Sequence, residues 1–112
     1  MDSLNLCALV GRIERPPTLR VGHASGTAQC SCTLRCDEVH ASGSVFTLYV
    51  PLTAYGKTAE ALEALPADAL VAIQGWLGWR KQVPKRGEEQ SGLAVFVRQV
   101  HLLMPALQEV HG

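Results

Sequence analysis

The segment at residues 45–55 alternates with a period of two between apolar and more polar side chains. Its even positions are apolar throughout, namely Phe46, Leu48, Val50, Leu52 and Ala54. Its odd positions include Tyr49 and Tyr55. A strand with this pattern buries its apolar face and leaves the other face open. The segment therefore predicts a β-strand with two flat rings on an open sheet face, an arrangement that can stack bases.

Hydrophobic periodicity and turn residues predict four further strands and one helix around this segment. The expected strands are 4–14 with a short extension at 18–21, then 27–39, 45–55, 70 to beyond 79, and 93–103. Ala59, Leu62 and Leu65 recur at helical spacing, so we expect a helix at 57–65 that ends at Pro66.

The order of these elements is typical of one all-β fold. Three strands, a short helix and two more strands, with Gly11 inside the first strand, make up an OB-fold. This fold is a five-stranded Greek-key barrel, here with the helix between strands 3 and 4. The expected domain spans residues 1–104, followed by a short tail at 105–112.

The charge of the chain is balanced, with 10 basic and 10 acidic residues and a formal net charge of zero. This balance argues weakly against a nucleic-acid partner, although a groove needs only local positive charge. The sequence shows no apolar run long enough to span a membrane and no secretory signal at its N-terminus. We therefore expect a cytoplasmic protein with reduced cysteines.

Candidate binding residues are aromatic and basic. Tyr49 and Tyr55 are expected to stack bases, Trp76 to stack or to lie in a subunit interface, and Trp79 to pack or to contact ligand. A basic cluster borders the loop between strands 4 and 5. It could be a solvated hairpin balanced by Glu88 and Glu89, but this loop flanks the groove of an OB-fold, so we favour phosphate contact. The basic candidates for phosphate contact are Arg12, Arg20, Arg35, Lys57, Arg80, Lys81, Lys85 and Arg86. Arg98 could serve either the groove or an interface.

The sequence offers no convincing catalytic or metal site. Cys30, Cys32 and Cys36 lie along one face of a predicted strand, where neighbours two residues apart are separated by roughly 7 Å. That spacing suits buried small side chains better than zinc ligands. The four histidines are scattered without a carboxylate or serine partner. We therefore expect a protein that is not an enzyme and uses no cofactor or metal.

Several stretches, taken in order, resemble bacterial single-stranded DNA-binding proteins. They are 9–13 with 17–20, 25–28, 50–57 with 59–60, 70–77 and 95–100, and the closest is the run that ends in Tyr55-Gly56-Lys57. The resemblance implies an OB-fold that binds single-stranded DNA without sequence preference and assembles into homodimers or homotetramers. It also implies work with replication, recombination or repair proteins in the bacterial cytoplasm, at the nucleoid.

The chain departs from that family in places. His40 and Gln82 stand where the family often has tryptophan, and the sequence ends at Gly112 without the family's acidic tip. The short primosomal replication proteins, which are single OB domains without that tail, are a second resemblance. A third interpretation is an adaptor whose Tyr49 and Trp76 face binds protein and not DNA.

Overall fold

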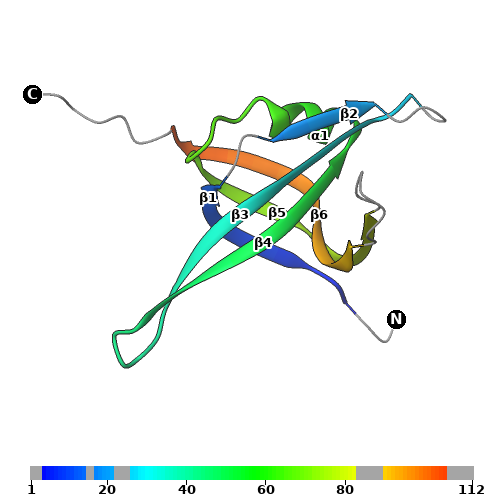
Figure 1. Cartoon of the computed structure of the whole chain (residues 1–112). Helices are drawn as coiled ribbons and strands as arrows, with labels where there is room; N and C mark the ends of the chain where they lie inside the picture. Colours follow the sequence, from blue (N-terminus) through cyan, green and yellow to red (C-terminus); the bar gives the residue numbers. More distant parts are fainter. Residues whose placement is uncertain (1–3, 15–16, 22–25, 83–89, 106–112) are drawn as a thin grey trace, which may run out of the picture.

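The computed structural model describes residues 4–14, 17–21, 26–82 and 90–105, and within them six strands form one closed sheet (Figure 1). The elements are β1 (Cys7–Ile13), β2 (Thr18–Val21), β3 (Ala28–Val39), β4 (Val45–Tyr55), α1 (Gly56–Glu63), β5 (Leu70–Gln82) and β6 (Gln90–Met104). The strand order is β1-β5-β6-β4-β3-β2, and a further pairing of β1 with β3 closes the barrel. Among the described strands, β4 and β6 pair in parallel and the other pairs are antiparallel.

The predicted OB-fold is confirmed, with its short helix between the third and fourth long strands. The alternating segment forms β4 with the expected bounds, and the extension at 18–21 forms a strand of its own, β2, along β3. The first strand begins three residues later than expected, whereas β6 is longer than expected at both ends. The helix begins at Gly56, whose φ of +62° lets the chain leave β4 and turn at once into α1.

The barrel interior is filled by aliphatic side chains from alternating strand positions. The largest fully buried ones are Ile13, Leu34, Leu52, Leu62, Val71, Ile73 and Val95. Ala59 and Leu62 bring α1 onto this core, so the helix covers the open end of the barrel. Cys30 and Cys36 are buried among them, as the sequence predicts, whereas Cys32, for which burial was also expected, is only partly buried. Burial of each large side chain stabilises the fold by about 1.5–3 kcal/mol.

The alternation in β4 predicts burial correctly for only half of the strand. Leu52 and Ala54 are buried, but Phe46 and Leu48 are 54% and 49% exposed, which corrects the expectation that they face the core. The reason is that β3 and β4 pair over their whole length and form a hairpin that extends beyond the barrel (Figure 1). Side chains near its tip therefore have no opposing sheet to pack against.

Candidate nucleic-acid interface

Three aromatic rings lie beside one another on the outer face of the barrel, one from each of three neighbouring strands. Tyr55 belongs to β4, Phe96 to β6 and Trp76 to β5. The ring centroids of Tyr55 and Phe96 are 6.3 Å apart with planes 16° from parallel. Those of Phe96 and Trp76 are 5.7 Å apart with planes 13° from parallel. We call these three residues the aromatic column.

Strand alternation and one glycine build this column. Val95 and Val97 of β6 are buried, so Phe96 between them points outward, and Trp76 lies directly opposite it on β5. A Cβ at Gly78 would stand 2.5 Å from a carbon of the Phe96 ring. Glycine is therefore what lets this ring lie so close to β5. Tyr55 and Trp76 remain 49% and 37% exposed, so their rings are accessible to a ligand.

Arg98 extends the column beyond Trp76. On β5, Gln74 and Gly75 are consecutive, but their partners on β6 are Gln99 and Val97, so Arg98 is the extra residue of a β-bulge. A bulge changes the direction in which its side chain points. The guanidinium carbon of Arg98 lies 5.6 Å from the centroid of the Trp76 ring, a cation–π contact.

Arg80, a predicted phosphate contact, crosses β6 and bonds to β4. Its Nη1 donates to the Thr53 hydroxyl at 2.9 Å and to the Leu52 carbonyl at 3.5 Å. Thr53 has the same parity in β4 as Tyr49 and Tyr55, which predicts an exposed side chain, yet it is fully buried. Arg80 satisfies the hydroxyl of this buried residue, so at least one of its guanidinium nitrogens has a structural role.

Tyr49 belongs to a second patch, with Arg12 and Arg35. Arg35 is paired with Arg12 on β1 and with Tyr49 on β4, so the three side chains share one face. Arg35 Nη1 lies 3.0 Å from Glu14 Oε2, and Arg12 donates to the Asp68 carbonyl at 2.9 Å. Both arginines are therefore already engaged within the protein.

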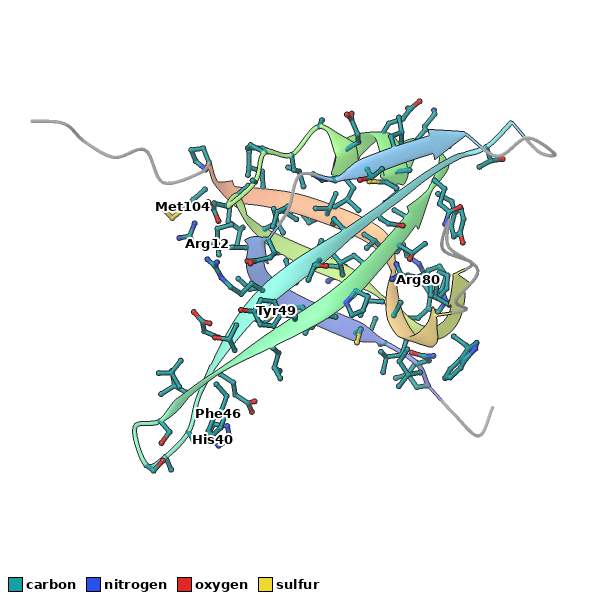
Figure 2. All side chains as sticks on the ribbon, in the orientation of Figure 1. Arg12, His40, Phe46, Tyr49, Arg80 and Met104 are labelled. Atoms are coloured by element: carbon teal, nitrogen blue, oxygen red, sulfur yellow. The ribbon has the colours of Figure 1, made fainter. Side chains whose placement is uncertain are left out.

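The structure does not bring the two predicted tyrosines together. They are six residues apart on β4, which corresponds to about 20 Å along a strand. Figure 2 accordingly shows Tyr49 and Arg12 on one part of the barrel and Arg80 on another. Tyr49 is 60% exposed, so it is accessible, but a single ligand residue cannot touch both rings.

The remaining predicted residues divide into two groups. Trp79 near the end of β5 is 66% exposed, and Lys57 is exposed in the first turn of α1. The side chains of Arg20 and Lys81 lie outside the described part of the chain, as do Lys85 and Arg86 altogether.

Phe96 is the residue that sequence reasoning missed. The available signal was its place between two inward-facing valines, the same alternation that identified Tyr49 and Tyr55 in β4. What the sequence alone does not reveal is that β6 pairs in parallel with β4, with Thr53 opposite Phe96. That pairing places the Phe96 ring between Tyr55 and Trp76.

The thiols of Cys30 and Cys32 are unreactive near neutral pH. Burial raises the pKa of Cys30 to about 11 and that of Cys32 to about 12, so both stay protonated near neutral pH. Protonated, buried thiols are poor nucleophiles and poor metal ligands. Within the described residues, histidine, cysteine and acidic side chains nowhere gather in a group of three able to hold a metal ion.

Comparison with known proteins agrees with this geometry. Residues 4–103 match the model of the single-strand binding protein family, whose members are DNA-binding proteins and not enzymes. No curated protein matches the chain. Among the described residues no helix is long and apolar enough to cross a membrane. Because the family match covers nearly the whole sequence and the fold is the OB-fold of that family, this chain belongs to the single-strand binding protein family.

Proposed function

We propose that this chain binds single-stranded DNA with little sequence preference by stacking bases on the aromatic column. The observation that carries the proposal is the column itself, three rings within 16° of parallel to their neighbours on an outer face. Every base has a flat π-face, so stacking on such rings discriminates little among bases. It contributes about 1–3 kcal/mol per base.

The charge of the three strands that carry the column supports the same proposal. The sequences of β4, β5 and β6 contain no aspartate or glutamate. They do contain Arg80, Lys81 and Arg98, and Lys57 follows at the start of α1. A phosphate near the column would therefore meet local positive charge, although the net charge of the whole chain is zero.

A longer strand would extend from the column to further contacts. In this proposal the exposed Trp79 and Lys57 would contact it outside the column, and the loop that contains Lys85 and Arg86 joins β5 to β6. The patch of Tyr49, Arg12 and Arg35 lies across β4, β3 and β1 and would contact a more distant nucleotide. In this proposal Arg20 and Lys81 contribute to the general attraction of phosphates.

We further propose that the chain assembles into a homodimer or homotetramer. Exposed apolar side chains gather around β1, at Leu4, Leu6 and Val10, and again at the end of β6, at Leu102, Leu103 and Met104. Two such patches on one small domain are more than an isolated monomer needs. Light scattering with and without oligo-dT measures the mass of the assembly, and a strictly monomeric mass in both would contradict this proposal.

The cellular role that fits is protection of exposed strands during replication, recombination or repair, in the cytoplasm at the bacterial nucleoid. A primosomal accessory role is the narrower alternative within this class. Both roles depend on partner proteins, so a test for them is co-purification with replication or repair enzymes in the presence and absence of single-stranded DNA.

Fluorescence titration with poly-dT tests the binding proposal. Trp76 is part of the column, so we expect quenching of tryptophan emission and an affinity that falls as salt rises, because bound phosphates release counterions. Absence of both quenching and salt dependence would refute DNA binding by this face. Replacing Tyr55 by Ala should weaken binding by about 1–3 kcal/mol.

An adaptor that binds protein is the candidate from another class, although Tyr49 and Trp76, which were expected to share its binding face, lie in separate patches. The exposed Phe46 and Leu48 on the hairpin are the observation that favours it, because exposed apolar surface is typical of protein interfaces. The Tyr49→Ala, Tyr55→Ala double variant separates the two functions. An adaptor predicts unchanged DNA affinity and altered assembly, whereas the DNA-binding proposal predicts the reverse.

A further inference from the structure

Among the basic side chains that the structure describes, Arg98 has the surroundings best suited to a phosphate. It lines a cavity of about 200 Å³ at the bulge between β5 and β6, together with Asn5, Leu6, Gln74, Gly75 and Gln99. The polar side chains of this cavity are one guanidinium and three amides, and it contains no carboxylate. Such a set supplies one positive charge and neutral N–H donors, which is the chemistry that a phosphodiester requires.

The amide of Asn5 closes one side of this cavity. Its Nδ2 donates to the Leu77 carbonyl at 2.7 Å, and its Oδ1 accepts from the Leu77 amide at 2.8 Å. Asn5 thereby continues, with its side chain, the antiparallel pairing that β1 makes with β5 from Cys7 onward. The wall that faces Arg98 is therefore held in place before any ligand arrives.

The guanidinium of Arg98 is oriented by Trp76. With its carbon 5.6 Å from the ring centroid, it lies over the tryptophan face. Guanidinium N–H groups lie in the plane of the group, so this contact leaves them available for oxygen acceptors. No acidic side chain in the described residues forms an ion pair with Arg98. Its charge is thus not neutralised by an ion pair, unlike that of Arg35.

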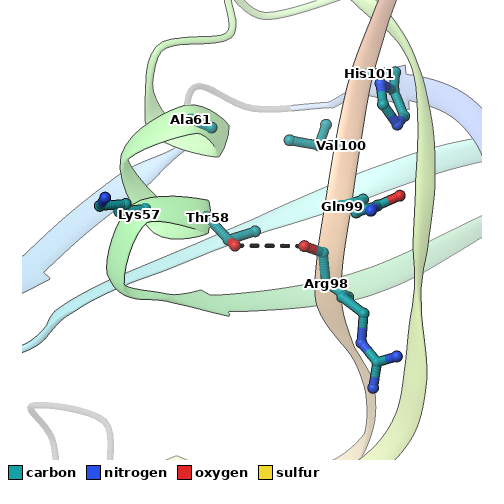
Figure 3. Close-up of a pocket in the computed structure, with 7 residues that line it drawn as sticks. All are labelled: Lys57, Thr58, Ala61, Arg98, Gln99, Val100 and His101. Carbon is teal, nitrogen blue, oxygen red and sulfur yellow. Dashed lines mark hydrogen bonds between the residues drawn. The ribbon is translucent and has the colours of Figure 1, made fainter.

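A neighbouring cavity is less suitable. It has about 280 Å³ and lies between α1 and β6, lined by Lys57, Thr58, Ala61, Arg98, Gln99, Val100 and His101. Figure 3 shows the Lys57 and Arg98 side chains leaving it in different directions, with Ala61 and Val100 between the helix and the strand. The Thr58 hydroxyl donates to the Arg98 carbonyl at 3.5 Å, so this cavity holds the backbone of Arg98 and not its charge.

We infer that Arg98 is a phosphate-binding residue, and that the DNA backbone passes through the cavity formed with Gln74 and Gln99 while its bases stack on the aromatic column. This inference rests on the proposed function. The bulge supplies the direction of the side chain, Trp76 orients the guanidinium, and the amides complete the donor set.

A methylphosphonate scan tests the inference. Each linkage of the shortest oligo-dT that binds with full affinity is replaced in turn by an uncharged methylphosphonate, because a minimal oligomer leaves a protein without sequence preference no room to shift its register. Affinity is measured for the wild type and for Arg98→Gln. We expect one linkage at which the wild type loses affinity and Arg98→Gln does not. The salt slope of Arg98→Gln should be lower by about 0.7, so its deficit at 50 mM salt should exceed that at 200 mM by about 2.6-fold.

Two further variants define the controls. Arg98→Lys keeps the charge but loses the planar fork, so it should keep the salt slope while binding more weakly. Lys57→Gln removes an exposed cation outside this cavity, and its effect should fall at a different linkage.

Each outcome has a separate meaning. If the wild type does not bind oligo-dT, the proposed function fails. If the wild type binds and quenches, but Arg98→Gln shares its salt slope and its methylphosphonate profile, the inference about Arg98 is wrong and the function stands. A change in preference among dT, dA, dC and dG oligomers with an unchanged slope would assign Arg98 to a base edge, which also overturns the inference.

Discussion

Replacing Phe96 is the most direct perturbation of the aromatic column. Phe96 is half-buried between Tyr55 and Trp76, and its ring touches both neighbours through near-parallel contacts. Phe96→Leu keeps an apolar side chain over Gly78 but removes the flat ring. Aromatic pairs contribute about 0.5–1.5 kcal/mol beyond their burial, so the folded state should lose about 1–3 kcal/mol over the two contacts.

The effect on binding should exceed what this loss of stability explains. Without the central ring, Tyr55 and Trp76 no longer form a continuous stacking surface, and a base loses about 1–3 kcal/mol of stacking. This corresponds to a 5- to 150-fold weaker affinity for oligo-dT, at about 1.4 kcal/mol per factor of ten. The assay is fluorescence titration at a temperature where urea denaturation shows that the variant is fully folded.

The chain offers a matched control because it contains just two phenylalanines. Phe46 lies on the projecting hairpin, where its ring contacts His40 at 4.5 Å between centroids. Phe46→Leu removes a ring of the same size from a place outside the column, so its affinity should stay within about twofold of the wild type by the same stacking scale. If Phe96→Leu binds as well as the wild type, or if both variants lose affinity equally, the column is not the stacking platform.

Three further changes test the architecture. Gly75→Ala would drive its Cβ into a backbone carbonyl of β6, so we expect a loss of about 1–3 kcal/mol in urea denaturation, whereas Gly92→Ala, with no atom within 4 Å, should be nearly neutral. Arg80→Met should lower the free energy of unfolding by about 1–3 kcal/mol because it leaves the buried Thr53 hydroxyl without its hydrogen-bond partner. Combining it with Thr53→Val should recover part of that loss. Burial raises the pKa of Cys32 in the folded chain from 9.0 to about 12, so an unfolded chain releases this proton first. Stability should therefore be complete below about pH 9 and fall as the pH rises further, and Cys32→Ala should flatten that decline in thermal denaturation.

Local sequence patterns were sufficient to predict the strands and the helix of this fold. The alternation over β4 is local, and it predicted both the strand and its bounds. The spacing of Ala59 and Leu62 likewise predicted the helix and the two side chains that it buries. Because these signals depend only on neighbours in sequence, the order of strands and helix could be read directly, and that order is distinctive enough to identify an OB-fold.

Local patterns did not predict how deeply individual side chains are buried, because burial depends on the tertiary arrangement of the strands. Phe46 and Leu48 follow the same alternation as Leu52, yet they are exposed because the hairpin extends past the barrel. Thr53 shares the parity of Tyr55, yet it is buried because Arg80 reaches it from β5 across β6. Alternation reports which face a residue occupies, but the depth of cover on that face depends on strands that are distant in sequence.

The distribution of charge resolves the apparent conflict between a neutral chain and a DNA-binding function. Glu14 and Asp68 pair with Arg35 on the far side from the column, and Asp37 accepts from the Thr47 hydroxyl on the hairpin. The acidic residues are thus absent from the three strands that carry the rings, so the attraction of phosphates is local and limited to a few cations. With few counterions released, stacking on Tyr55, Phe96 and Trp76 must supply the larger part of the affinity, and salt should modulate binding and not abolish it.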